Sequence, residues 1–166
     1  MKLIGMLFIV VSAGSVGIGM AVSLKKNVQL MRQMLRILQI LRNEIAFCGT
    51  PLPQAFALAA ASCDGVLSML FADTAKKMDR NPWMTAAEAM KQVEFSQQNS
   101  QLLSICVELA EGLGQYDLNS QLCAVSSAKE RTEALLNYAE QERSVKSKLY
   151  ETLGICAGLS MAILLI

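Results

Sequence analysis

The chain has 166 residues, a formal net charge of +1, 53% hydrophobic residues and 17% charged residues. Ordinary soluble domains contain about 45–50% apolar and about 25% charged residues, so this chain is too apolar for that class. The near balance of 15 basic and 14 acidic side chains argues against nucleic-acid binding, because neutralising phosphates requires a clustered basic excess.

Two uncharged runs lie at the ends of the chain. The first run covers the 22 residues Leu3–Leu24. A helix rises about 1.5 Å per residue, so a helix of this length can cross a bilayer. The second covers Thr152–Ile166, only 15 residues, which is marginal for a full span. We therefore expect a transmembrane helix at residues 1–24, a helical domain at 25–150 and a hydrophobic membrane segment at 151–166.

Basic residues give the expected orientation. Only Lys2 precedes the first run, whereas a cluster of bases follows it: Lys25, Lys26, Arg32, Arg36 and Arg42. The positive-inside rule therefore places residues 25–150 in the cytoplasm. The five cysteines form no Cys-x-x-Cys pair, as is typical of proteins in a reducing compartment.

A cleaved signal peptide is the alternative interpretation of the first run, with Ala21–Ser23 as a small-residue cleavage site. The run is longer than the apolar region of a signal peptide, which has about 7–15 residues. In a signal peptide the basic residues precede this region, whereas here most of them follow it. Under this alternative the chain would be an exported or membrane-tethered helical protein-binding module.

Helical patterns fill the interval between the runs. Apolar residues at spacings of three and four predict a helix over 27–47, which ends at Gly49 and the prolines after it. A short alanine-rich helix over 51–62 follows, with Thr50 as its expected N-cap. Asp64 is the expected N-cap of the next helix, which ends at Asn81-Pro82.

The second half of the interval continues in the same way. Thr85 and Glu88 have capping-box spacing and predict a helix over 86–96. A further helix over 99–113 ends at glycines, and Asp117 is the expected cap of a last helix without Gly or Pro from Leu118 to Leu153. No strand pattern of useful length is present. The fold class is therefore all-α, a bundle of about six helices flanked by membrane helices.

The residues that enzymes use are largely missing. The chain has no histidine, which excludes histidine triads and histidine-ligated metals, and no phosphate-binding glycine loop. Asp73 with Asp79, or Glu108 with Glu111, could form carboxylate pairs, but at helical spacing such pairs are typical of a solvated face. We expect a non-catalytic protein without a metal or cofactor.

Small residues suggest where membrane helices pack. Gly154 and Gly158 form a Gly-x-x-x-Gly pair, and Gly17 lies on a similar ridge with Ala13 and Ala21. Such ridges allow two helices to approach each other in lipid.

Four residues near the last two helices are candidates for either an interface or a structural joint: Gly112, Gly114, Asp117 and Gln121. As a joint, the glycines would end one helix and Asp117 would cap the next. As an interface, the same residues would contact a partner directly, and both interpretations stay open here.

Several short segments together resemble the stage III sporulation protein AB family. In chain order they are Met1–Gly5, Gln33–Glu44, Gly49–Ala55, Ala86–Ala89, Leu113–Asp117 with Gln121, Leu149–Tyr150, Leu153–Gly154 and Ala157–Leu159. Each is weak alone, but their order, spacing and total length cover nearly the whole chain. The departures are Ser126–Ala128 in a less charged last helix, Tyr116 and Cys48.

The resemblance implies more than the residue patterns do. Members of this family resemble the helical F domain of type II secretion platform proteins. The resemblance implies a platform in the mother-cell membrane around the forespore of an endospore-forming bacterium. The implied partners are a stage III sporulation AA-type ATPase and other membrane subunits of the same complex. The membrane itself and a second copy of the chain are further expected partners.

Overall fold

The computed structural model describes residues 24–93, 100–114 and 117–165. Every regular element in these ranges is helical, and none is a strand. The elements are a first helix over 24–43 that continues as the π-helical turn η1 (Glu44–Cys48), then α2 (Leu52–Ala61), α3 (Val66–Arg80), α4 (Ala86–Lys91), α5 (Ser100–Gly112) and α6 (Leu118–Leu165). The expected all-helical fold class is confirmed.

Two of the expected helix boundaries have the predicted chemistry. Gly49 follows η1 with a left-handed backbone at φ 60°, a conformation that glycine adopts without steric cost. At α4, the Glu88 N–H donates to the Thr85 hydroxyl over 3.2 Å, and the Thr85 N–H donates to the Glu88 carboxylate over 3.0 Å. This reciprocal pair is the predicted capping box.

Two other expected caps are wrong. Pro51, not Thr50, is the N-cap of α2, and the Thr50 hydroxyl instead donates to the Glu44 carboxylate over 2.6 Å. Gly65, not Asp64, is the N-cap of α3, and it makes no side-chain cap bond. At Thr50 the reason is the bond to Glu44, which takes the hydroxyl away from the free amides of α2.

The core of the bundle lies between the apolar faces of these helices. Phe56 on α2 and Phe71 on α3 meet edge to face, with ring centroids 5.5 Å apart. Two buried hydroxyl groups, those of Thr74 and Thr132, each donate to the carbonyl four residues earlier over 2.7 Å. The largest fully buried side chains are Phe56, Phe71, Met34, Ile37, Leu38, Leu41, Leu67, Leu70, Met90, Leu102, Leu109 and Val125.

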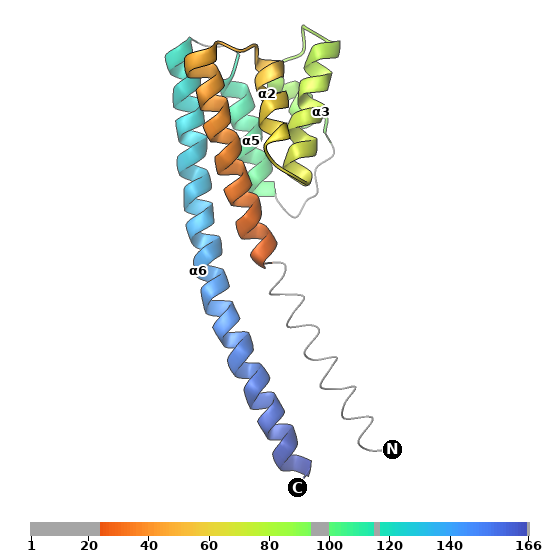
Figure 1. Ribbon diagram of the computed structural model, residues 1–166, viewed down its shortest axis with the longest axis vertical. Coiled ribbons are helices and arrows are strands. Elements are labelled where there is room, and N and C mark those ends of the chain that lie inside the picture. Colours follow the sequence, from red (N-terminus) through yellow and green to blue (C-terminus); the bar gives the residue numbers. More distant parts are fainter. Residues whose placement is uncertain (1–23, 94–99, 115–116, 166) are drawn as a thin grey trace. The chain divides into compact units, whose positions relative to one another are not determined.

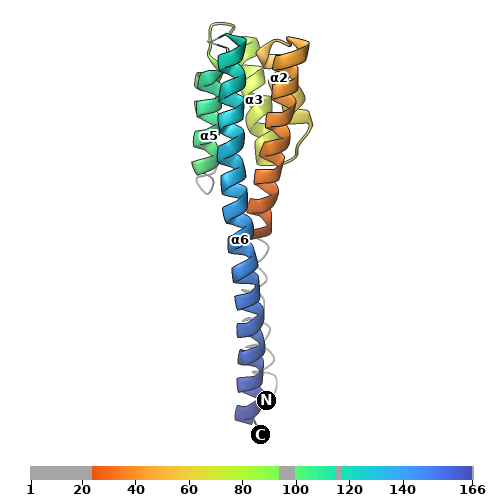
Figure 2. The same cartoon turned by 90° about the vertical axis from the view of Figure 1, so that its left-hand side faces the viewer.

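The compact unit of the chain is Leu30–Leu135, and the flanking parts of the chain form a second unit. Within the compact unit the helices run side by side, with the first helix next to α2 and to the beginning of α6 (Figure 1, Figure 2). Because successive helices alternate in direction, the described residues of three connections lie at one end of the bundle: residues 49–51, residues 81–85, and Leu113 and Gly114 with Asp117. We call this the bundle end.

The expected membrane segments are not confirmed. Residues 1–23, which make up nearly all of the first expected span, lie outside the described residues. Among the residues that are described, no helix combines the length and the apolar character required to cross a membrane. Residues 151–165 of the second expected segment belong to α6, which continues to Leu165.

Candidate functional site

Gly112 lies where α5 packs closely on α6. It is the last residue of α5, and a Cβ atom placed on it would lie 2.5 Å from the Cβ of Ala124. Real Cβ atoms do not approach one another this closely. Gly112 therefore allows the two helices to approach, which is a packing role.

Gly114 makes the turn that follows. Its φ of +85° lies in the region that side chains disfavour, and an added Cβ would lie 3.3 Å from Leu52 at the start of α2. The α5–α6 connection therefore lies close to α2 at the bundle end. A shallow hollow of about 380 Å³ lies beside it, lined by Gly112, Asn119, Ser120, Cys123 and Ala124.

Asp117 accepts hydrogen bonds at the start of α6. The Ser120 hydroxyl donates to its carboxylate over 2.6 Å, and the backbone N–H groups of Ser120 and Asn119 also donate to it. The Ser120 hydroxyl, followed by these backbone groups, holds the pKa of the Asp117 carboxyl below its ordinary value of 3.8. The Gln121 N–H donates to the Asp117 carbonyl over 3.1 Å, which begins the helix.

The four candidate residues are thus brought together as a helix–turn–helix joint. Gly112, Gly114 and Asp117 each have a packing, turn or capping role that needs no partner. Gln121 is half-buried and has an interaction of its own. Direct contact of these four with another protein stays a prediction.

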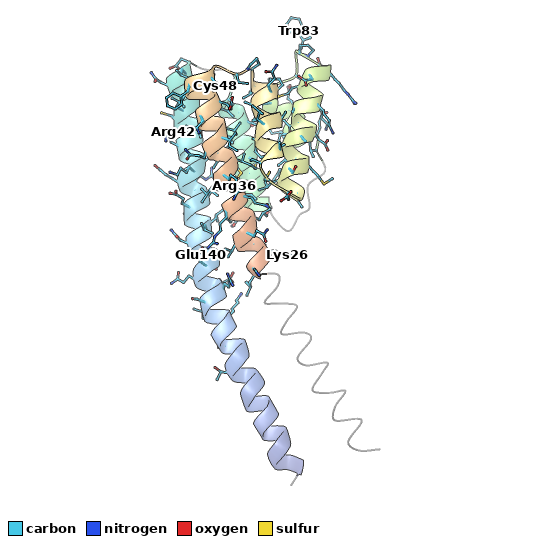
Figure 3. The ribbon with its side chains drawn as sticks, viewed as in Figure 1. Lys26, Arg36, Arg42, Cys48, Trp83 and Glu140 are labelled. Carbon is cyan, nitrogen blue, oxygen red and sulfur yellow. The ribbon has the colours of Figure 1, made fainter. Side chains whose placement is uncertain are left out.

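Sequence reasoning missed two aromatic side chains at the same end of the bundle. Trp83, in the connection between α3 and α4, is 93% exposed, and Phe47, at the end of η1, is 86% exposed. Figure 3 shows Trp83 and Cys48, the neighbour of Phe47, at this end of the bundle. The Asn81-Pro82 pair predicted a turn, but nothing in the pattern indicated that Trp83 would point into solvent.

The turn that carries Trp83 is well defined. The Asn81 side-chain carbonyl accepts from the Trp83 N–H over 3.3 Å, and the Asn81 backbone carbonyl accepts from the Met84 N–H over 3.0 Å. The capping box of α4 begins directly after it. The position of Trp83 is therefore fixed by a hydrogen-bonded turn between two helices.

Three of the four carboxylates considered as catalytic pairs have ion-pair partners on the surface. Asp73 lies 3.5 Å from Lys76, and Glu111 lies 2.7 Å from Lys91. Glu108 pairs with Arg131. Each of these acids therefore faces its own base rather than a second carboxylate.

The cysteines divide into two kinds. Cys48 and Cys123 are exposed, whereas Cys63 and Cys106 are buried. Burial raises the pKa of the Cys106 thiol to about 12, and its sulfur lies 3.8 Å from that of Met34. Across the part of the chain that is described, no three His, Cys, Asp or Glu side chains gather in a way that could hold a metal ion.

The candidates for membrane helix packing are only partly placed. Gly17 lies outside the described residues, and Gly154 and Gly158 lie in α6. Their role in packing stays a prediction.

Comparison with known proteins gives a consistent result. The profile of the family "Stage III sporulation protein AB" matches residues 2–166. Stage III sporulation protein AB of Bacillus subtilis (strain 168) is 31% identical over 170 residues, covering 99% of both chains. A solved structure of a stage III sporulation protein AB has a similar fold, with a TM-score of 0.62 and 24% identity over 72% of this chain and 98% of that one. The chain therefore belongs to the stage III sporulation protein AB family.

Proposed function

We propose that this sporulation protein is a non-catalytic membrane platform whose bundle end binds a secretion-type ATPase. It would belong to a secretion-like complex that links the mother cell and the forespore. The observation that carries the proposal is the pair of aromatic side chains at the bundle end, Trp83 at 93% exposure and Phe47 at 86% exposure.

Aromatic side chains exposed on a fixed surface can anchor a partner protein. Tryptophan is strongly enriched among the residues that dominate binding energy, and aromatic residues in general are enriched at interfaces. Loops held by a rigid scaffold are also common positions for binding residues. Trp83 and Phe47 meet these conditions, because one lies in a connection and the other at the end of a helix.

The surroundings of Phe47 favour a protein partner. The chain has no charged residue from Ile45 to Cys63, so the connection beside Phe47 is uncharged. This connection is also fixed, because the Thr50 hydroxyl bonds to Glu44 and the Thr50 N–H donates to the Glu44 carbonyl over 3.3 Å. A fixed surface loses less conformational entropy when it binds.

The joint between α5 and α6 supports this surface from the same end of the bundle. Gly112 and Gly114 let the connection pack against Ala124 and Leu52. The joint would therefore shape the binding surface without itself making the main contacts.

The proposal also places the protein in the mother-cell membrane with the bundle in the cytoplasm. It is supported by the uncharged runs at both ends of the sequence and by the bases that follow the first run. Single cysteines placed between residues 60 and 140 and labelled with a membrane-impermeant reagent would test this. Labelling only after the cells are permeabilised is expected, whereas labelling of intact cells would indicate the exported binding module instead.

The binding proposal is tested by co-purifying the detergent-solubilised full chain with the ATPase of the same complex. Trp83→Ala and Phe47→Ala should each weaken the association at least about tenfold, as expected of residues that dominate an interface. Met69→Ala is the matched control, because Met69 is 66% exposed but lies near the start of α3, away from the bundle end. Failure of the parent pair to associate, or equal losses in all three variants, would contradict the proposal.

A further inference from the structure

The end of the first helix departs from a regular α-helix. Its last turn, η1, is π-helical, and the Gly49 N–H donates to the Glu44 carbonyl, five residues earlier. The Thr50 N–H donates to the same carbonyl over 3.3 Å. π-helical turns are rare in proteins, and many of them lie at functional sites. The turn that carries Phe47 is therefore unusual, and its backbone bonds close on a single residue, Glu44.

A side-chain bond closes the same turn. The Thr50 hydroxyl donates to the Glu44 carboxylate over 2.6 Å, and both side chains are only partly exposed. Hydrogen bonds to a charged group are stronger than those between neutral groups, and burial strengthens them further. Thr50 is thus bonded to both the carboxylate and the carbonyl of Glu44. We call these two bonds the Glu44–Thr50 clamp.

The clamp takes Thr50 away from the role that local sequence favours. A threonine just before a helix commonly caps it, and α2 begins two residues later, at Leu52. In the structure Pro51 is the N-cap, and no side-chain bond caps α2. Proteins break such local preferences mainly at functional or strained sites. The use of the Thr50 hydroxyl therefore points to a function of the turn before α2, not to the stability of α2.

The turn carries two large apolar side chains in very different surroundings. Ile45 is 9% exposed and belongs to the core, whereas Phe47, two residues later, is 86% exposed. Residues two positions apart on a helical turn do not share a face, so an Ile45 side chain in the core directs Phe47 away from it. Phe47 also lies inside the segment that the clamp closes. Opening the clamp would free the backbone of Phe47 while Ile45 stayed in the core.

The clamp also selects between two backbone arrangements of this turn. In a regular α-helix the Glu44 carbonyl would accept from the Cys48 N–H, four residues later, instead of the Gly49 N–H. The side chains after Glu44 would then turn about the helix axis, because the hydrogen-bonded ring would enclose one residue fewer. Thr50 opposes this change because its two bonds hold the chain beyond Gly49 to Glu44. The direction of Phe47 therefore depends on the clamp.

We infer that Glu44 and Thr50 are positioning residues, whose bonds hold Phe47 in the direction in which it contacts the ATPase. This inference rests on the proposed binding of the ATPase at the bundle end. A side chain that is already held in its bound direction loses less conformational entropy on binding, so the clamp raises affinity without touching the partner. Trp83 does not depend on the clamp, because its own turn is bonded to Asn81.

Hydrogen exchange in the free full chain tests the clamp by itself. Thr50→Val keeps the size of the side chain and removes the hydroxyl donor. The Gly49 amide should then exchange at least about tenfold faster than in the parent, because a hydrogen bond to a charged group no longer closes the turn. Thr50→Ser keeps a hydroxyl and should restore slow exchange. A Gly49 exchange rate that Thr50→Val leaves unchanged would overturn the inference.

Association of the detergent-solubilised full chain with the ATPase tests the role in binding. Thr50→Val should weaken the association about three- to tenfold, which corresponds to the cost of ordering one side chain on binding. Thr50→Ser should recover most of the lost affinity. Equal weakening by the two variants would count against the inference, because the hydroxyl would then not be the group that matters.

Combined substitutions separate positioning from general damage to the bundle. In a Phe47→Ala background, Thr50→Val should weaken the association by less than about twofold, because no phenyl ring remains to be positioned. In a Trp83→Ala background, the full three- to tenfold loss should return. Equal losses in the two backgrounds would refute the positioning role, since they would reflect the whole bundle and not Phe47.

Thr132→Val is the matched control. It makes the same change of a hydroxyl to a methyl group at a buried residue of α6, about 20 Å along the helix from Leu118. It should leave both the Gly49 exchange rate and the association unchanged, and effects equal to those of Thr50→Val would overturn the inference. A parent that does not bind the ATPase, or a Phe47→Ala variant that binds as well as the parent, would instead overturn the proposed function and this positioning role with it.

Discussion

Two connections at the bundle end contrast with one another. The α5–α6 connection is packed, since Gly112 lies against Ala124 and Gly114 lies near Leu52. The α3–α4 connection, which carries the 93% exposed Trp83, projects into solvent although its turn is hydrogen-bonded. Gly112 and Gly114 therefore lie against other helices, whereas the Trp83 side chain is nearly free of contacts. We therefore expect changes in the first to affect stability and changes in the second to affect binding.

The largest effect is expected for Gly112→Ala. At an open helical position this change usually stabilises a protein, because alanine has the better helix propensity. Here the new methyl group would lie 2.5 Å from the Ala124 Cβ, so α5 and α6 must separate. We expect a loss of about 1–3 kcal/mol in the free energy of unfolding, measured by thermal or chemical denaturation of the full chain.

The double variant Gly112→Ala with Ala124→Gly is the control. It removes the second methyl group and should recover part of the loss, as contacting residues are energetically coupled. A stabilised Gly112→Ala variant would show that the helices do not approach closely at this point.

A smaller loss is expected for Gly114→Ala. The backbone at φ +85° disfavours a side chain, which costs roughly 1–2 kcal/mol for a left-handed residue. The nearby Leu52 methyl group, at 3.3 Å, can move aside and adds little. Denaturation of the full chain measures the loss, and Gly114→Asn should be tolerated better because asparagine adopts this conformation more readily. Equal losses for the two variants would point to crowding instead of backbone conformation.

Asp117→Ala should lower the melting temperature by a few degrees at neutral pH. The folded pKa of Asp117 is depressed, first by the Ser120 hydroxyl and then by backbone N–H groups. A depressed pKa stabilises the fold above the ordinary value of 3.8, and this contribution disappears as the pH falls through the folded pKa.

The difference in melting temperature between the parent and Asp117→Ala should therefore shrink in acid. Circular dichroism of the full chain over a pH series measures it. Glu88 has a depressed pKa as well, first because the Thr85 N–H bonds to its carboxylate and then because the Thr85 hydroxyl does, so Glu88→Ala should behave similarly at α4. A difference that does not change with pH would show that the Asp117 carboxylate does not cap α6.

The smallest effect on stability is expected for Trp83→Ala, within about 0.5 kcal/mol, because the side chain is nearly free of contacts. If the same variant also binds the ATPase more weakly, the α3–α4 connection contributes to binding and not to stability, in contrast to the α5–α6 connection. A large loss of stability would instead show that Trp83 packs on the bundle in solution.

Much of the fold could be predicted from local patterns. Apolar spacing indicated each helix, Gly49 ended the first, and the Thr85–Glu88 pair began α4, because all three depend on neighbouring residues alone. The caps at Thr50 and Asp64 were predicted wrongly, because the hydroxyl of Thr50 finds Glu44 and Gly65 takes the first position of α3. Local cap preference could not predict the Thr50 outcome, because the hydroxyl's partner Glu44 lies in the preceding helix.

The sequence by itself determined an all-helical chain, a turn near Gly112 and Gly114, and bases gathered before the first acid. Periodicity, turn chemistry and charge order depend on neighbouring residues alone. Only the tertiary structure decided that Gly112 meets Ala124, that Trp83 faces solvent and that Arg42 lies across a groove from Glu130. The physical reason is that each of these relations joins residues from different helices. Helix packing sets their distances, and no local pattern encodes them.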